Sequence, residues 1–402
     1  MTSKKLTRFA VSCAMLSMAG LCNAQYIRPA YSFPSEEIGG VEMGDSAVYA
    51  TPSVGLGVGH DDNLFLSNTN TKSSVIEVLS PGLRLDAHRP GLVLKSSWQA
   101  QYGRYTDSRA DDYQDQYWLN SADWALDQRT FFRLGYDYLR GHDARGSTDR
   151  PNSDSPDRYR LSVPRAMFAY GAPGAQGRVE LYYSDAHKDY LNHHDTTAVS
   201  DRDTTEAGGA FYWRVGPKTY ALVEARDTKI DYDIQNPLSG HETRYYIGAS
   251  WEATAATTGT VKIGELRRSF DGDNIPSHTS PSWEAEITWS PRTYTQFDFF
   301  STRYTNESTG LGDYILTAVS GVTWTHQWNS RVTSAVALKY QKDEYQGFDR
   351  TDNSKIVGLK VGYKFRPWLT LGAEYSYTNR DSNIDIYDYN KNLYLLTATA
   401  SM

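Results

Sequence analysis

The strongest constraint on the fold is an alternation of apolar and polar residues that runs through long segments of the chain. In the stretch RPGLVLKSSWQAQYGRYTD, residues 89–107, the even positions from 92 to 102 are mostly apolar or aromatic, whereas the odd positions include Lys95, Gln99 and Gln101. A repeat of two residues is the geometry of a β-strand, because successive side chains point to opposite faces. The stretch therefore predicts a strand with one apolar and one polar face.

The same alternation predicts eighteen strands, or sixteen if a hairpin is miscounted. Their expected ranges are 52–65, 74–88, 92–105, 113–126, 131–141, 157–170, 177–190, 203–215, 218–232, 243–255, 259–270, 281–289, 293–305, 313–328, 331–345, 354–365, 368–379 and 390–402. Crossing the hydrocarbon of a membrane takes a tilted strand of about 9 to 11 residues. Segments such as KIVGLKVGYKF (355–365) meet that length.

The connections between these strands alternate in length. Short ones are rich in Pro, Gly, Ser and Asn, such as RPG at 89 and SPR at 290, whereas 141–156 and 192–203 are long and polar. Short turns at one end and long loops at the other are typical of an outer-membrane barrel. We therefore expect an all-β fold: a transmembrane antiparallel up-and-down β-barrel.

Aromatic residues are expected to mark the two membrane interfaces, because an apolar ring can be buried while its polar atom stays wet. Near the short turns lie Trp213, Trp289, Trp328 and Trp368. Beside the long loops lie Tyr105, Tyr113, Tyr190, Tyr232, Tyr304, Tyr314, Tyr345 and Tyr377. The β-propensity of aromatic residues explains their abundance but not these positions.

The first residues have the order of a secretory signal peptide: Lys4, Lys5 and Arg8, then an apolar run from Phe9 to Leu21, then small residues up to Ala24. About a dozen apolar residues are too few for a membrane anchor. We expect a cleaved signal peptide over 1–24, a periplasmic lead-in segment over 25–50 and the barrel over 51–402. Both cysteines fall in the signal peptide, so a closed sheet rather than disulfides would stabilise the mature protein.

The opposite face of the strands carries many charges of both signs, which cannot face lipid, where each would cost about 2 to 4 kcal/mol. A closed sheet of about eighteen strands is roughly 35 Å across, too wide for side chains to fill. We therefore predict a pore, and segment 141–156 is long enough to fold inward as a constriction or to leave the lumen open. The predicted lumen-lining residues are Lys95, Gln99, Arg133, Arg178, Glu180, Tyr212, Arg214, Arg244, Tyr246, Lys262, Glu284, Glu286, Lys339, Lys360 and Glu374.

Inward Lys and Arg are roughly matched by Asp and Glu, which argues against strong ion selectivity. The alternative for each charge is a structural pair with a neighbouring strand. Hydroxyl, amide and Tyr side chains among them suit a sugar. We find no H-E-x-x-H, G-x-S-x-G or P-loop motif, and His193 and His194 in NHHD lack the spacing of a metal site. We expect no enzyme, no catalytic residues, no cofactor and no metal.

Residues 52–87, PSVGLGVGHDDNLFLSNTNTKSSVIEVLSPGLRLDA, combine a Pro-led strand, Asp61-Asp62-Asn63 before an apolar residue, a Ser/Thr/Lys loop and a strand with an internal Pro81. This resembles the opening of the β-barrel porin-2-like outer-membrane proteins of exopolysaccharide and capsule biosynthesis systems. The resemblance implies passage of a polysaccharide across the outer membrane. It also implies that Asp61, Asp62 and Asn63 fix the first outer loop, although a simple turn signal would look the same.

We therefore expect a monomer in the outer membrane of a Gram-negative bacterium that exports an extracellular polysaccharide. The alternatives are a diffusion porin or oligosaccharide uptake channel, and a structural or adhesive barrel that conducts nothing. Expected partners are outer-membrane lipid, lipopolysaccharide, a polysaccharide or oligosaccharide and, for export, periplasmic components; no nucleic acid is expected.

Overall fold

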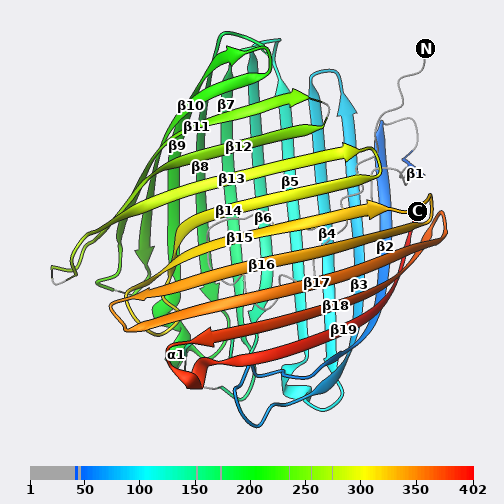
Figure 1. The fold of residues 1–402 in the computed structure, drawn as a ribbon, viewed down its shortest axis with the longest axis vertical. Coiled ribbons are helices and arrows are strands. Elements are labelled where there is room, and N and C mark those ends of the chain that lie inside the picture. The colour runs from blue at the N-terminus through cyan, green and yellow to red at the C-terminus, as the bar shows by residue number, and fades with distance from the viewer. Residues whose placement is uncertain are drawn as a thin grey trace.

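The computed structural model describes residues 41–43, 47–150, 153–172, 174–234, 236–254, 256–273 and 275–402. The strands form one 19-stranded antiparallel sheet, in which the two-residue β1 (Val41–Glu42) is added beside β2. The other strands, 19 − 1 = 18, each pair with the next along the chain, and β19 pairs with β2 to close the ring. The fold is thus the expected up-and-down barrel of eighteen strands (Figure 1).

The barrel strands are β2 (Val48–Asp61), β3 (Ser74–Arg89), β4 (Leu92–Tyr105), β5 (Tyr113–Ala125), β6 (Thr130–Asp143), β7 (Asp157–Tyr170), β8 (Gly177–Tyr190), β9 (Arg202–Gly216), β10 (Thr219–Tyr232), β11 (Gly240–Thr254), β12 (Thr257–Phe270), β13 (His278–Arg292), β14 (Thr295–Glu307), β15 (Tyr314–Gln327), β16 (Val332–Gln346), β17 (Arg350–Arg366), β18 (Leu369–Ser382) and β19 (Tyr389–Ser401). Short helices lie in the long loops: η1 (Arg109–Asp111), α1 (His194–Thr197), η2 (Ala198–Ser200) and η3 (Asp385–Tyr387). Among the described residues, no helix is long and apolar enough to cross a membrane.

The first barrel strand is where the sequence-based bounds were wrong: β2 is Val48–Asp61, not 52–65. Its first residues pair with β3, with Val48 opposite Ala87 and Thr51 opposite Arg84, so the ladder begins before Pro52. Many other strands extend a few residues beyond the expected ends, as β13 does, because their ladders continue into polar sequence outside the apolar pattern. The expected signal peptide and residues 25–40 of the lead-in lie outside the described residues.

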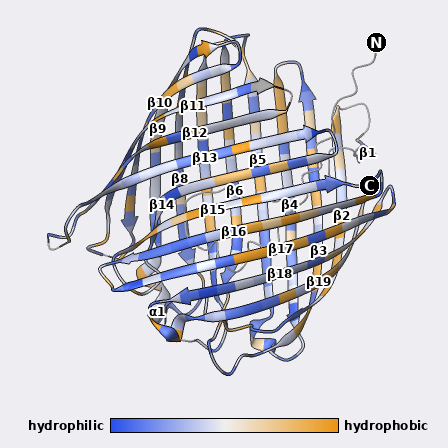
Figure 2. Ribbon diagram, viewed as in Figure 1, coloured by the Kyte–Doolittle hydropathy of each residue, from blue (hydrophilic) through white to orange (hydrophobic). Residues whose placement is uncertain are grey.

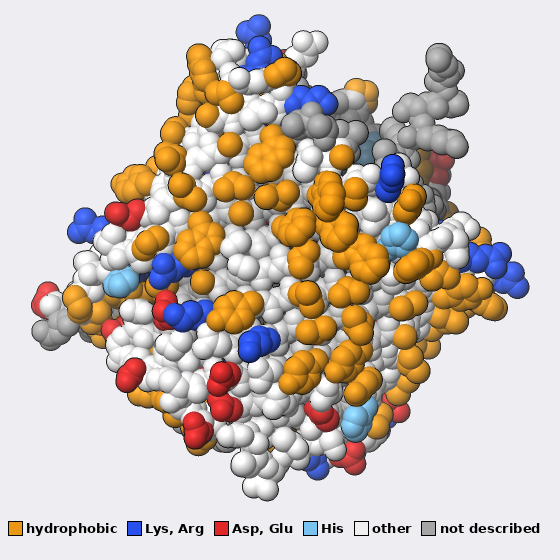
Figure 3. Space-filling model, viewed as in Figure 1, with side chains coloured by type: hydrophobic (Ala, Val, Ile, Leu, Met, Phe, Trp, Pro, Cys, Tyr) orange, Lys and Arg blue, Asp and Glu red, His pale blue; other side chains and the backbone are white. Residues whose placement is uncertain are grey.

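The two faces of the wall differ as the alternation predicted. Ile247 of β11 and Ile263 of β12 are directly opposite each other, and both are exposed on the outer face. Hydrophobic residues alternate with polar ones along the strands, and hydrophobic side chains spread across the outer face of the front strands (Figures 2 and 3). Burying this surface in lipid satisfies the hydrophobic effect, while the closed ladder leaves no unpaired strand edge.

The two expected aromatic girdles had different outcomes. The tryptophans near the short turns, Trp213, Trp289, Trp328 and Trp368, are exposed as a headgroup position requires. Most of the tyrosines beside the long loops instead turn inward. Tyr190 is buried and its hydroxyl donates to Asp143 (2.8 Å), while the hydroxyl of Tyr232 donates to Glu307 (2.6 Å). The expectation of an outer tyrosine girdle was wrong, because these side chains support the loops at the mouth of the barrel.

A charge in the middle of the outer face should destabilise the barrel. Ile247 lies at the midpoint of β11 and is 61% exposed. We expect Ile247→Arg to lower the free energy of unfolding in lipid vesicles by about 2 to 3 kcal/mol, because the guanidinium would enter hydrocarbon. Urea titration followed by Trp fluorescence measures this change. The control is Thr260→Arg, which faces inward opposite Glu286; an equal loss in both variants would contradict the assignment of the faces.

Candidate functional site

The candidate site is the inner face of the wall, where the strand register places the predicted lumen-lining residues. Across β11, β12 and β13, Gly248, Lys262 and Glu284 lie side by side in one row, on the opposite face from Ile247 and Ile263. By the same alternation every predicted member lies on the inner face. These are Lys95, Gln99, Arg133, Arg178, Glu180, Tyr212, Arg214, Arg244, Tyr246, Lys262, Glu284, Glu286, Lys339, Lys360 and Glu374.

A group of paired inner charges lies on β9, β10, β12 and β13, around Arg226. Its guanidinium bonds Glu224 at 2.5 Å and Glu284 at 3.1 Å, and the ammonium of Lys262 bonds the same two carboxylates at 2.9 and 2.5 Å. Glu206 of β9 lies 4.0 Å from Arg226. We call Glu206, Glu224, Arg226, Lys262 and Glu284 the charge cluster. Alternation in the sequence places Glu206, Glu224 and Arg226 on the inner face, as it does Lys262 and Glu284.

Tyrosine side chains accompany the charge cluster. The Tyr182 hydroxyl donates to Glu224 (2.7 Å) and accepts from Arg226 (3.2 Å). The ring of Tyr246 lies 5.1 Å from the Lys262 ammonium and 5.8 Å from the Arg226 guanidinium, within cation–π range. Tyr212 donates to Glu180 (3.2 Å), which also pairs with Arg178. The inner wall over β8–β13 therefore combines aromatic rings with closely paired charges of both signs.

The same pairing recurs elsewhere on the inner face. Lys360 bonds Glu374 at 2.5 Å across β17 and β18, and Arg133 bonds Asp123 at 2.5 Å across β6 and β5. At the short-turn end, Arg214 donates to the carbonyl of Gly174 (2.5 Å). For these residues the geometry favours the structural alternative, in which wall charges pair with neighbouring strands. The consequence is that the Lys360–Glu374 and Arg133–Asp123 pairs add little net charge to the lining.

The loop between β6 and β7 crosses the mouth of the barrel. The Arg350 guanidinium, at the start of β17, donates to Asp149 of this loop at 2.6 Å, and Thr309 donates to the same carboxylate at 2.9 Å. Around the ring, β17 is seven steps from β6, through β2 and β19. A contact between elements so far apart on the wall requires the loop to lie over the bore. The described part of segment 141–156 therefore folds inward.

Buried contacts hold the base of this loop. Arg150 donates to Asp143 and Asp157, both at 2.8 Å, and to the Tyr190 hydroxyl at 3.1 Å. Gly146 has a φ of 78°, and an added Cβ would lie 1.9 Å from the carbonyl oxygen of Phe65, so only glycine fits there. The loop is thus a packed element and not a solvated tip.

A second inward element comes from β14 and β15. The β13–β14 ladder ends at Trp283 and Arg303, and beyond this point the Ser282 hydroxyl donates to the Arg303 carbonyl (2.8 Å). Arg268 of β12 then bonds Glu307 at 3.0 Å. Because inward side chains of β12 and β13 hold β14, the β14–β15 hairpin tip leans into the lumen. Its Thr309 meets Asp149, so two elements narrow the outer mouth together.

The Asp61-Asp62-Asn63 motif joins the first strand to the last. The Asp62 carboxylate accepts hydrogen bonds from the backbone N–H and the side-chain amide of Asn392 in β19, at 2.6 and 2.7 Å. Lys391 bonds Asp61 at 2.7 Å. Buried Asn63 donates to the carbonyls of Ser67 and Asn390, both at 2.9 Å. These contacts hold the first loop against β19 and clasp the seam where the barrel closes.

Removing this clasp should loosen the seam. We expect Asn63→Ala to lower the free energy of unfolding by about 2 kcal/mol, because two carbonyls lose their partner in a buried site. Thermal unfolding measures this loss of stability, with the folded fraction at each temperature read from the heat-modifiable shift of the barrel on a gel. Asn68→Ala in the same loop is the matched control, since its amide donates from an exposed position to Asp385. A smaller effect at position 63 than at 68 would rule out the clasp.

The described residues contain no group of three or more His, Cys, Asp or Glu side chains that could hold a metal ion. The two histidines of the NHHD segment have different surroundings. His193 bonds Asp157 at 2.8 Å, whereas His194 begins α1. The segment therefore supports the fold of the loop between β8 and β9.

Several solved structures are similar to the chain at low sequence identity. No curated protein matches the chain. The solved structures similar to it include the FrpB iron transporter from Neisseria meningitidis, at 11% identity and a TM-score of 0.44, covering 82% of this chain and 62% of that one. They also include OccK2 (OpdF) from Pseudomonas aeruginosa in complex with glucuronate, at 8% identity and 0.49, covering 88% and 98%. A bacterial polysaccharide outer membrane secretin is similar at 9% identity and 0.38, covering 87% and 98%.

The family comparison covers the whole barrel. A family model described as "Putative beta-barrel porin 2" matches residues 37–402. The match extends from before β1 to the end of β19 and so includes every strand of the wall. With the closed ring of eighteen membrane-length strands, this places the protein in the bacterial outer membrane. The chain belongs to the putative beta-barrel porin 2 family of outer-membrane barrels.

Proposed function

We propose that this barrel exports an extracellular polysaccharide across the outer membrane. The observation that carries the proposal is the lining over β8–β13, where the rings of Tyr182, Tyr212 and Tyr246 stand beside closely paired charges. A polyhydroxylated chain can hydrogen-bond to such charges and pack its C–H faces on the rings. The resemblance of residues 52–87 to proteins of exopolysaccharide and capsule systems supports the direction of transport.

The test is deletion of the gene followed by measurement of secreted and periplasmic polymer. Export predicts that secreted polymer falls and periplasmic polymer accumulates, and that the wild-type gene restores secretion. Complementation with Tyr182→Ala/Tyr212→Ala should restore less secretion than Tyr102→Ala, a tyrosine exposed on the outer face of β4. Unchanged secretion in the deletion strain would exclude export.

The second candidate is a diffusion porin or oligosaccharide uptake channel. The porin description of the matching family favours it. Uptake predicts that a strain lacking the gene grows slowly on an oligosaccharide while its polymer secretion stays normal. A barrel that adheres but conducts nothing would give no current in planar bilayers, even after the β6–β7 loop is released.

A further inference from the structure

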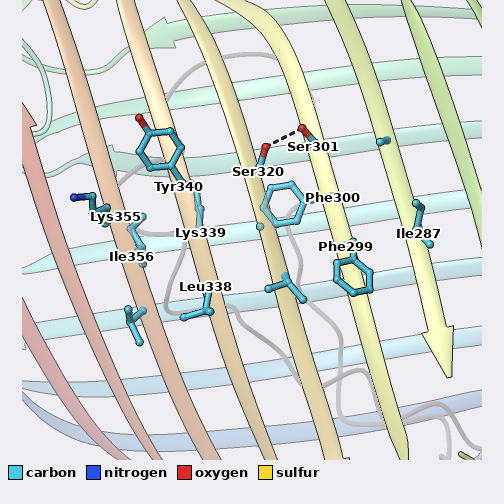
Figure 4. A pocket seen from close by; sticks show the side chains of 14 residues that line it. Ile287, Phe299, Phe300, Ser301, Ser320, Leu338, Lys339, Tyr340, Lys355 and Ile356 are labelled. Atoms are coloured by element: carbon cyan, nitrogen blue, oxygen red, sulfur yellow. Dashed lines mark hydrogen bonds between the residues drawn. The ribbon is translucent and has the colours of Figure 1, made fainter. Parts of the chain in front are cut away.

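Outside the lumen, the outer wall carries a groove of about 650 Å³ over β13–β17. The alternation places its main lining side chains on the lipid-facing side of the wall, where Leu338 and Tyr340 are exposed (Figure 4). The groove exists because Ala285, Ser301 and Ser320 form a row of small residues between larger neighbours. Ordinary outer-wall rows in a barrel are filled with bulky apolar residues, so this depression departs from the pattern.

Three parallel rows of side chains on the outer face determine the chemical character of the groove and its borders. The row toward the short turns is apolar and contains Ile287, Phe299, Val322, Leu338 and Val357. The middle row contains Ala285, Ser301, Ser320, Tyr340 and Lys355. The row toward the long loops contains Trp283, Arg303, Ala318, Lys342 and Asn353. The surface therefore changes from apolar to basic over four residues of strand.

The polar atoms of the middle row already bond one another. Trp283 donates its indole N–H to Ser301 (2.9 Å), the Ser301 and Ser320 hydroxyls lie 2.8 Å apart, and Tyr340 donates to Asn353 (2.7 Å). Because these groups are satisfied within the wall, the groove presents an apolar surface to its occupant. An acyl chain can lie against it without breaking a hydrogen bond.

Arg303 and Lys342 of the last row, together with Lys355 of the middle row, keep excess positive charge, and we call these three residues the basic row. Lys342 and Arg303 share one carboxylate, Glu344, at 2.7 and 3.5 Å. Lys355 is exposed beside them, and Asp381 of β18 lies opposite Asn353. Three cations thus face two carboxylates, and Lys and Arg side chains border the hydrophobic surface of this face (Figure 3).

The position of this row matches the outer headgroup level. Lys342 lies 342 − 332 = 10 residues from the start of β16 at the short-turn end. Ten residues of a strand tilted by about 40° rise about 25 Å, the height of the apolar band of an outer-membrane barrel. The groove lies below that level, inside the hydrocarbon of the outer leaflet.

We propose that this groove is a binding site for the phosphorylated glycolipid of the outer leaflet, lipid A. One acyl chain lies on the Ser301–Ser320 row, and a sugar phosphate binds Arg303, Lys342 and Lys355. Each cation near an anionic headgroup contributes modestly, so the three act together with burial of the chain. Phosphatidylethanolamine, which carries no net charge, would fit the groove but not the basic row.

The experiment uses the whole barrel in detergent and native mass spectrometry with hexa-acyl diphosphoryl lipid A as the probe. We expect a single tight adduct, and a roughly tenfold or greater loss of affinity in Arg303→Gln/Lys342→Gln/Lys355→Gln, equivalent to about 1.4 kcal/mol. Ser320→Phe, which fills the groove and leaves every charge in place, should also weaken the adduct. Arg104→Gln, an exposed outer-face cation on β4, should leave it unchanged.

Several outcomes would overturn the proposal. Equal lipid A affinity of the wild type and the triple variant would contradict the proposed phosphate site. Unchanged affinity in Ser320→Phe would contradict the proposed acyl-chain site. If phosphatidylglycerol bound as tightly as lipid A, the surface would attract anionic lipids in general and would not be a specific lipid A site. Gel heat-modifiability confirms that each variant is folded, so a loss of binding cannot be mistaken for a loss of the barrel.

Discussion

Replacing Asp149 with alanine should open the outer mouth and raise the ionic current through the barrel. Asp149 is the point at which the β6–β7 loop bonds both Arg350 and Thr309. The Arg350 side chain is fully buried, also bonds Asp352 and stacks on the ring of Tyr387 at 3.5 Å. Breaking a buried ion pair costs about 3 to 5 kcal/mol, so the ratio of open to closed loop should rise by about two to four orders of magnitude.

Single-channel recording in planar bilayers measures the open probability directly. The matched control is Asp154→Ala, in the same loop, because its carboxylate is 96% exposed and lies 3.6 Å from His193. Wild-type and Asp154→Ala barrels should spend most of the recording at low conductance, whereas Asp149→Ala should reside at a higher level. Identical traces for Asp149→Ala and wild type would mean that the loop does not limit the bore.

Removing the central cation of the charge cluster should have the second large effect. Arg226 is bonded to Glu224 and Glu284 and lies near Glu206, so Arg226→Met leaves the three carboxylates with Lys262 alone. We expect the free energy of unfolding to fall by about 3 kcal/mol, because partly buried carboxylates lose their counter-charge. The lumen should also become cation-selective, since the lining gains net negative charge.

Urea unfolding and the reversal potential in a salt gradient test these two consequences separately. Arg226→Met/Glu284→Gln should recover part of both losses, because one carboxylate is neutralised with the cation. Arg133→Met is the control: Arg133 pairs with Asp123 alone and is partly exposed, so its removal should cost about 1 kcal/mol or less. A reversal potential unchanged in Arg226→Met would show that permeating ions do not pass the charge cluster.

The inner charges and the tyrosines near the long loops show what alternation in the sequence can predict and what it cannot. Alternation places Lys262 and Glu284 on the inner face, and the structure puts them in one row, 2.5 Å apart. It also places Tyr232 near a long loop, but gives no sign that its hydroxyl bonds Glu307, because the two are 75 residues apart in the chain. The prediction of an outer tyrosine girdle was wrong for this reason. The distance of a tyrosine from a loop in the sequence indicates its height on the barrel wall, but not the residue to which its hydroxyl bonds.

The Asp61-Asp62-Asn63 motif shows the same limit of prediction from sequence. The sequence associates Asp61, Asp62 and Asn63 with a turn after the first strand. The contact of Asp62 with Asn392 joins residues 330 apart and exists only when the ring closes. The signal that could have revealed it is the pairing of the first and last strands that any closed barrel requires.

The sequence by itself determined the local properties of this protein: strands of membrane length, their number, the faces that meet lipid and water, and the alternation of short turns with long loops. Each follows from the two-residue period of a pleated strand and from the cost of placing charge in hydrocarbon. Only the tertiary structure decided which inner charges pair, that the β14–β15 tip leans inward and that Asp149 reaches Arg350. Those contacts depend on strand register and on how the closed ring brings distant loops together, and neither is encoded in the period of a single strand.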